Sequence, residues 1–124
     1  MPKTELRAFK KDDGTIPLAE WLRSLSDKAK QNCIIKIERL RDMGFQLRRP
    51  ECDYLRDGIY ELRAKHGTVN YRILYAFTGK DIVLLSHGCT KEKAVPKIEI
   101  ERAVKNLAQY NRNPEKYSCE RIEL

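Results

Sequence analysis

Three stretches with β-forming composition follow one another between residues 58 and 88, and they constrain the fold more than any other feature. Their sequences are GIYELRAK, TVNYRILYAF and DIVLLSHG, which are rich in β-branched and aromatic residues with partial alternation. The separators HG and TGKD are short enough to be hairpin turns. Because consecutive strands joined by short turns usually pair with each other, the sequence predicts an antiparallel meander.

Amphipathic helices are predicted on both sides of this meander. The first covers residues 16–25 and has Pro17 in its first turn, where a helix tolerates proline. The second is longer, with Ser26 as its N-cap and an end near Gly44. A closing helix over residues 96–111 has one continuous apolar face.

The remaining segments complete the plan of one domain. Residues 5–10 are typical of a short strand that ends in a turn, and residues 114–124 form either a loosely held tail or a final edge element. A chain of 124 residues falls in the range of one compact domain. We therefore expect an α+β fold over residues 1–124, with a small antiparallel sheet, an N-terminal helical hairpin and a C-terminal helix.

The charge of the chain favours an anionic partner. The formal net charge is +7 at pH 7, and most of the basic excess lies in the middle of the sequence. Such a chain attracts polyanions, so nucleic acid, a ribosome or an acidic protein ranks above a neutral metabolite. The alternative is that the charge serves solubility alone.

Several function classes are disfavoured by composition. The four cysteines are widely separated, which indicates reduced thiols in a cytoplasmic protein rather than a zinc cage or a disulfide framework. No apolar run approaches the roughly 20 residues that span a bilayer, so we expect no membrane association. The acidic pairs, Asp12 with Asp13 and Glu99 with Glu101, are expected on a turn and on an exposed helix side, away from the strands. A site for Mg²⁺, and hence a two-metal nuclease, is therefore not expected.

Two arginines, Arg63 and Arg72, lie in the first two strands of the meander, and their relative position depends on the turn. If HG is a two-residue turn, Glu61 lies opposite Arg72, and Arg63 lies diagonal to Arg72 on the same face. A three-residue turn places the two arginines on opposite faces. On one face, with Lys65 nearby, the pair would suit phosphate oxygens. The simpler alternative is that Arg72 pairs with Glu61 across the strands.

The end of the third strand supplies further groups for chemistry on a phosphodiester. The stretch SHGCTKEK is expected to bring His87, Lys91 and Lys93 into a loop beside the same sheet. Cleavage of RNA needs an activated 2'-hydroxyl, charge stabilisation at phosphorus and a proton for the leaving 5'-oxygen. Histidine, lysine and arginine can supply all three without a metal or another cofactor.

Aromatic side chains for base stacking are also present in and near the hairpin. Most of them are expected in the core, because aromatic residues on strands usually bury. The candidates for exposure are Tyr71, which is next to Arg72, and Tyr54, which lies in the preceding connector.

The sequence resembles the RelE/ParE toxin superfamily of bacterial toxin–antitoxin systems, and within it the phage-derived, HigB-like branch. The resemblance rests on PLAEWLRSL, LRDGIYELRAKHGTVNYRILYAF, IVLLSHGCTKEK and PKIEIERAVKNLAQY, which cover most of the chain in the family's order. It implies a RelE-like fold and a ribosome-dependent endoribonuclease that cuts mRNA during translation. It also implies neutralisation by an antitoxin, usually a small helix-turn-helix protein (HigA-like) in this branch.

The resemblance also implies roles for single residues. Arg72 matches the family arginine that contacts the scissile phosphate, and Arg63 falls at a basic position on the adjacent strand. Lys91 falls where relatives carry a basic residue that serves the leaving group. Independently of the resemblance, Lys65 and Lys93 are expected to add positive charge for RNA binding.

Three departures from the family's pattern affect the expected chemistry. Glu61 stands where the best-studied relatives have a lysine, no tyrosine stands beside Lys93, and Cys89 replaces an aromatic residue. The general base is therefore unassigned by the resemblance, and His87 is the preferred candidate. Two alternatives stay open: a ParE-type toxin that poisons DNA gyrase without cutting, because one scaffold hosts both functions, and a non-toxic nucleic-acid-binding module.

Overall fold

The computed structural model describes residues 4–90 and 94–120, and its elements largely follow the predicted order. The helices are α1 (Pro17–Arg23), α2 (Asp27–Met43) and α3 (Lys97–Arg112), and the short 3-10 helix η1 (Gly44–Gln46) follows α2. The strands are β1 (Glu5–Phe9), β2 (Cys52–Arg56), β3 (Ile59–His66), β4 (Val69–Phe77), β5 (Ile82–Thr90) and β6 (Ser118–Cys119).

The strands form one sheet in the order β2-β3-β4-β5-β1-β6. Strands β3, β4 and β5 pair antiparallel in succession, so the predicted meander is confirmed. Strand β1 pairs parallel with β5, and the other neighbouring strands pair antiparallel. The fold is therefore α+β with a mostly antiparallel sheet, as the sequence predicted.

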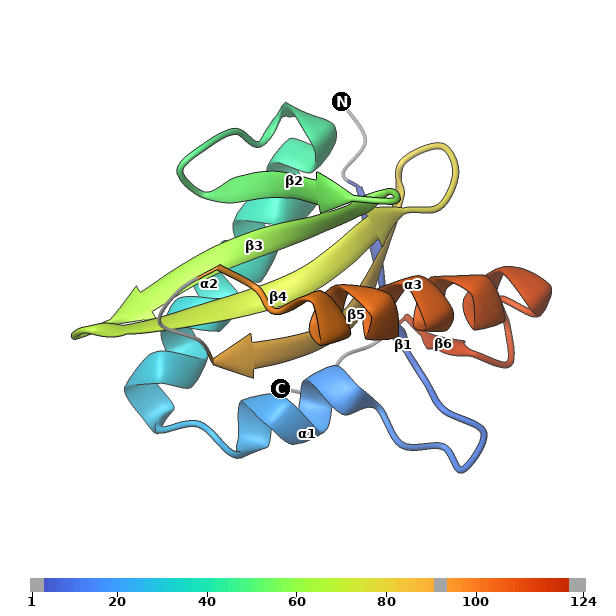
Figure 1. Cartoon of the computed structure of the whole chain (residues 1–124), viewed down its shortest axis with the longest axis horizontal. Helices are drawn as coiled ribbons and strands as arrows, with labels where there is room; N and C mark the ends of the chain where they lie inside the picture. The colour runs from blue at the N-terminus through green and yellow to red at the C-terminus, as the bar shows by residue number, and fades with distance from the viewer. Residues whose placement is uncertain (1–3, 91–93, 121–124) are drawn as a thin grey trace.

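The helices cover the two faces of the sheet unequally, as Figure 1 shows. Helices α1 and α2 pack on one face, where Leu18 and Cys33 join strand residues such as Leu62 and Leu85 in the larger core cluster. Helix α3 crosses the opposite face and covers a smaller cluster. That cluster contains Ile59, Leu74, Ala76, Cys89, Val95, Ile100 and Ala103.

Local signals in the sequence explain where the first two helices begin and end. Pro17 occupies the first turn of α1, where its missing N–H costs no hydrogen bond. The Oγ of Ser26 accepts a hydrogen bond from the backbone N–H of Ala29 at 3.3 Å and caps α2. Gly44 ends α2 with a φ of +56°, a conformation that favours glycine.

Helix α1 is held against β5 by one close contact. A Cβ atom added to Gly88 would lie 2.1 Å from a ring atom of Trp21, so the indole ring rests directly on the backbone of β5. Trp21 also meets Tyr71 edge to face, with 6.2 Å between ring centroids. The glycine thus determines how closely α1 approaches the sheet.

Strand β2 is not predicted by the local sequence pattern, which also allows two interpretations of the C-terminal segment. Strand β2 has five residues with little alternation and follows Pro50, so the stretch was interpreted as a connector. It pairs antiparallel with β3 and forms one edge of the sheet. At the other edge, β6 pairs antiparallel with β1 through Phe9 and Ser118, so the described part of the tail is an edge element.

Candidate phosphate-binding site

The turn between β3 and β4 places Arg63 and Arg72 directly opposite each other. His66 pairs with Val69, so the two-residue turn consists of Gly67 and Thr68, with Gly67 at a φ of +61°. The predicted two-residue length is confirmed, but the turn lies one residue further along the chain. The partner of each β3 residue is thereby displaced by two residues along β4, which is an even number, so the two arginines stay on the same face of the sheet. They are direct partners instead of diagonal neighbours.

Glu61 holds the two arginines together. The Nη1 atom of Arg72 donates to Oε1 and Oε2 of Glu61 at 2.9 and 2.8 Å, and the Nε atom of Arg63 donates to Oε1 at 2.8 Å. The carboxylate is buried, with a side chain only 3% exposed. The cross-strand pairing of Arg72 with Glu61 is thus present, although Glu61 lies diagonal to Arg72. It coexists with the arginine pair, because one carboxylate serves both guanidinium groups.

A second carboxylate extends this cluster toward the edge of the sheet. Asp53 on β2 accepts from Nη2 of Arg63 at 3.2 Å and from Nε of Arg49 at 2.9 Å. The hydrogen bond from Arg49 is the main reason that the pKa of Asp53 lies below its ordinary value, because a donated bond favours the charged carboxylate. Sequence reasoning missed Asp53, because the strand that presents it was interpreted as a connector.

The cluster leaves positive charge accessible at the surface. Its two carboxylates, Glu61 and Asp53, face the three guanidinium groups of Arg49, Arg63 and Arg72. The side chain of Arg63 is 37% exposed and that of Arg72 is 13% exposed. Among the described residues, the Nε atom of Arg72 is buried without a hydrogen-bond partner, which is uncommon for a charged group.

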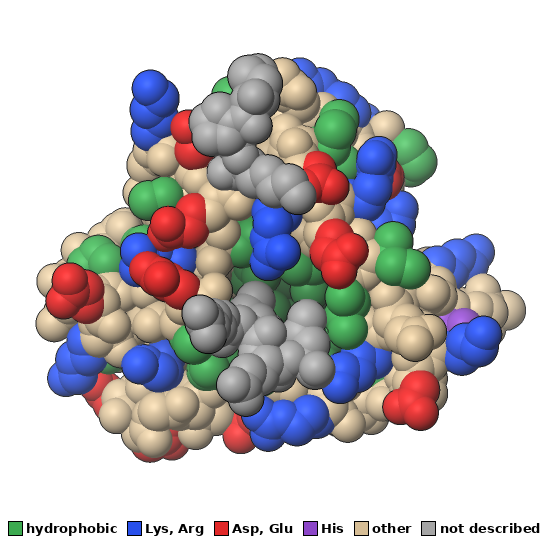
Figure 2. Space-filling model, turned by 180° about the vertical axis from the view of Figure 1, so that it is seen from behind, with side chains coloured by type: hydrophobic (Ala, Val, Ile, Leu, Met, Phe, Trp, Pro, Cys, Tyr) green, Lys and Arg blue, Asp and Glu red, His purple; other side chains and the backbone are tan. Residues whose placement is uncertain are grey.

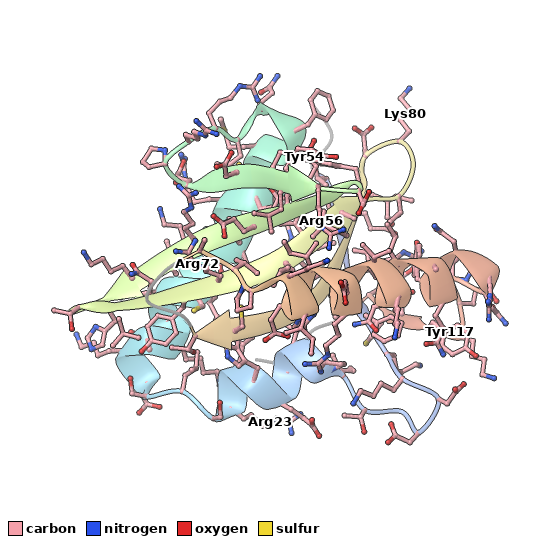
Figure 3. All side chains as sticks on the ribbon, in the orientation of Figure 1. Arg23, Tyr54, Arg56, Arg72, Lys80 and Tyr117 are labelled. Atoms are coloured by element: carbon pink, nitrogen blue, oxygen red, sulfur yellow. The ribbon has the colours of Figure 1, made fainter. Side chains whose placement is uncertain are left out.

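Figure 3 labels Arg72 on β4, on the side of the sheet that α3 crosses. The exposed residue Lys65 follows Arg63 by two positions on β3, so its side chain leaves the sheet on that side as well. On the opposite side of the molecule, Figure 2 shows basic side chains interspersed with acidic ones rather than gathered in one patch. The row of Arg72, Arg63 and Lys65 is therefore the feature of this sheet face that fits a phosphate group.

His87 lies inside β5 and not in the predicted loop, which corrects its expected position. Its side chain is 1% exposed and lies under α3, with Nδ1 2.8 Å from Oγ of Ser86 and Nε2 3.4 Å from a carboxylate oxygen of Glu99. Glu99 therefore faces the sheet and is not on a solvent-exposed helix side. Burial and the nearby Arg102 lower the pKa of His87 to about 4, so the imidazole is neutral near pH 7. In this arrangement the ring is covered, and a substrate reaches it only if α3 moves.

The structure separates Tyr71 from the arginines. Its side chain is buried on the sheet face that α1 and α2 cover, in the larger core cluster. This corrects the prediction that Tyr71 is exposed for base stacking. Tyr54, the other candidate, is 52% exposed on the edge strand β2.

Lys91 and Lys93 lie outside the described residues, so their predicted roles stay predictions. Over residues 4–90 and 94–120, no group of three or more histidine, cysteine, aspartate or glutamate side chains is placed to hold a metal ion. In the same ranges, no helix has both the length and the apolar composition that crossing a membrane requires.

The model of one protein family, described as phage-derived protein Gp49-like (DUF891), matches residues 20–108. No curated protein matches the sequence. The matched range covers most of the chain and includes Arg49 and strands β2 to β5, and with them the arginine cluster and His87. The chain belongs to the family of phage-derived, Gp49-like proteins.

Proposed function

We propose that this protein is the toxin of a toxin–antitoxin pair, in the HigB-like branch of the RelE/ParE superfamily, and that it cuts mRNA on the ribosome without a metal ion. The observation that carries the proposal is the direct pairing of Arg63 with Arg72 on one sheet face, with both guanidinium groups anchored by Glu61. Membership of the Gp49-like family, which is associated with such toxins, supports it.

The arginine pair supplies binding and charge stabilisation in this mechanism. Two planar guanidinium groups hold the non-bridging oxygens of one phosphodiester, and their bonds to Glu61 fix both groups before the RNA arrives. The 2'-hydroxyl attacks the adjacent phosphorus, and the bond to the 5'-oxygen breaks. Negative charge grows on the phosphoryl oxygens at that moment, so prepositioned cations lower the barrier.

The proton transfers are assigned to His87 and to Lys91, which lies outside the described residues. Lys91 donates a proton to the leaving 5'-oxygen, and His87 accepts the proton of the 2'-hydroxyl. The second role requires α3 to move away from β5, because the imidazole is covered in the present arrangement. Lys65 and Lys93 add positive charge for RNA binding.

The partners follow from this activity. The toxin works in the cytoplasm on mRNA bound to the ribosome, and a helix-turn-helix antitoxin neutralises it. A basic protein with net charge +7 is suited to the phosphate-rich surface of a ribosome.

The test is controlled expression of the protein, followed by measurement of growth and of mRNA 5'-ends. Expression of the native protein should arrest growth and produce new ends within translated messages. Arg72→Ala should abolish both effects, whereas Arg23→Ala, an exposed position on α1 far from the site in Figure 3, should leave them unchanged.

A folding control is needed, because Arg72→Ala removes one partner of a buried carboxylate. A thermal melt of each purified variant shows whether the fold is kept, and Arg72→Lys retains the charge without the fork geometry. If a folded Arg72→Ala variant arrests growth as strongly as the native protein, the assignment is wrong. Arrest with intact messages and a DNA-damage response would indicate gyrase poisoning instead.

A further inference from the structure

A second concave site lies at the edge of the sheet, beside the arginine cluster. It is a cavity of about 400 Å³ between η1, the segment that follows η1 and strands β2 to β4. Its lining is mostly aromatic and apolar, with two arginines. The lining includes Phe45, Arg48, Arg49, Asp53, Tyr54 and Tyr60.

Two of these aromatic rings are exposed although neighbouring rings support them. Phe45 is 67% exposed and meets Phe77 edge to face, with centroids 6.1 Å apart. Tyr54 is 52% exposed and meets Tyr60 in the same way at 5.0 Å. Edge-to-face packing on a partly buried neighbour, Phe77 or Tyr60, holds each outer ring in place. Such rings are typical of platforms on which planar groups stack.

The two arginines give this cavity a positive rim. Nη1 of Arg48 donates to the carbonyl oxygen of Phe45, and Nε of Arg49 donates to Asp53. Both arginines are exposed, and a guanidinium group has five N–H donors, so each retains donors that point to no described residue. An anion at the rim is therefore favoured.

Asp53 connects this cavity to the arginine pair. Its Oδ1 atom accepts from Arg49 at the cavity, and its Oδ2 atom accepts from Arg63 in the pair. One short side chain thus bridges a guanidinium group of each site. Tyr60, Tyr75 and Phe77 pack with the core cluster on the sheet face that α2 covers, whereas the arginine pair lies on the α3 face, so a ligand reaches both sites by passing round the β2 edge.

We propose that this cavity binds one base of a single-stranded RNA, stacked on Tyr54 and Phe45, with a flanking phosphate on Arg48 and Arg49. The inference rests on the proposed function, in that RNA is the substrate, and it adds a nucleotide subsite next to the scissile phosphate. A stacked base with an attached phosphate matches both the flat aromatic lining and the positive rim. An apolar protein side chain would match the lining alone.

The experiment measures binding of a fluorescein-labelled 2'-O-methyl oligoribonucleotide of about ten nucleotides, a length within the usual range for such grooves. The 2'-O-methyl groups prevent cleavage, so the anisotropy reports binding alone. Tyr54→Leu and Phe45→Leu keep apolar volume without a ring, and each should weaken binding by about 5- to 150-fold. Tyr54→Trp should bind like the native protein. Arg49→Ala should also reduce the salt dependence of binding by about one phosphate contact.

Matched controls lie on other surfaces. Ile98→Ala changes an exposed apolar residue on α3, and Arg23→Ala changes an exposed cation on α1. Both should retain native affinity. A thermal melt of each variant confirms folding. If one of the two leucine variants does not fold, the binding affinity of the other variant tests the proposal.

The outcomes separate this inference from the proposed function. Native affinity for the oligonucleotide in a folded Tyr54→Leu or Phe45→Leu variant overturns the subsite. The cavity would then be assigned to binding of a protein partner instead of RNA. Weakened binding in those variants, together with intact mRNA on expression of the native protein, supports the subsite and overturns the nuclease assignment.

Discussion

The Nη1 atom of Arg72 lies 2.9 and 2.8 Å from the two carboxylate oxygens of Glu61, and this buried ion pair sits under the surface that we assign to phosphate. Glu61 has two opposing effects there. It fixes Arg72 and Arg63 in position, and it neutralises part of the charge that attracts RNA.

We therefore predict that Glu61→Gln strengthens RNA binding and weakens the fold. Loss of one negative charge should raise affinity for the 2'-O-methyl oligonucleotide several-fold at low salt and steepen the salt dependence. The free energy of unfolding should fall by about 3 kcal/mol, because the largely buried Arg72 loses its carboxylate partner, whereas Arg63 is partly exposed and keeps Asp53. Salt-dependent anisotropy and urea denaturation measure the two effects. Glu115→Gln, at an exposed position, is the control; similar gains in affinity for both variants would refute the role of Glu61.

The stability of the fold should depend on His87 at mildly acidic pH. In the folded protein its pKa is about 4, against 6.5 for an ordinary histidine, because burial disfavours the charged ring. The unfolded chain therefore binds more protons between these two values. The free energy of unfolding should fall by up to about 3 kcal/mol as the pH drops through this window, and the contribution is complete above it.

Urea denaturation, followed by the fluorescence of the single tryptophan Trp21, measures this pH dependence. His87→Gln should remove most of the decrease between about pH 6.5 and pH 4.5. His66→Gln, at the exposed last position of β3, is the matched control and should behave like the native protein. Equal slopes for native and His87→Gln proteins would show that the buried ring is not responsible.

Gly88→Ala should disturb the packing of α1 on the sheet. The new methyl group would lie 2.1 Å from the ring of Trp21, so the indole must move. We expect a loss of about 1 to 3 kcal/mol in the free energy of unfolding and a change in tryptophan emission. Trp21→Leu makes room for the methyl group, so the double variant should lose less than the sum of the single variants. Additive losses would mean that the clash is not the cause.

Ser26→Ala should lower the free energy of unfolding by about 1 kcal/mol, because the N–H of Ala29 loses its capping oxygen. Ser26→Asp should retain native stability, since aspartate also caps helices. Thermal and urea denaturation of both variants check the prediction. A loss of the same size in both would point to a role of the serine other than capping.

Much of the fold was predictable because it follows from local patterns. The period-two stretches gave β3, β4 and β5, and the apolar faces with Pro17 and Ser26 gave the helices. Strand β2 was missed because its five residues carry little alternation, and it becomes a strand only by pairing with β3. The parallel pairing of β1 with β5 joins segments far apart in the sequence, and no local pattern indicates such a contact.

For the candidate site, the sequence by itself determined the residue types, the charge and the even spacing that puts Glu61, Arg63 and Lys65 on one face of a strand. Only the tertiary structure decided which of them meet. The turn at Gly67 and Thr68 set the register that brings Arg63 opposite Arg72, and edge strand β2 brought Asp53 to Arg63. The packing of α3 buried His87, because burial depends on which element covers a strand and not on the strand itself.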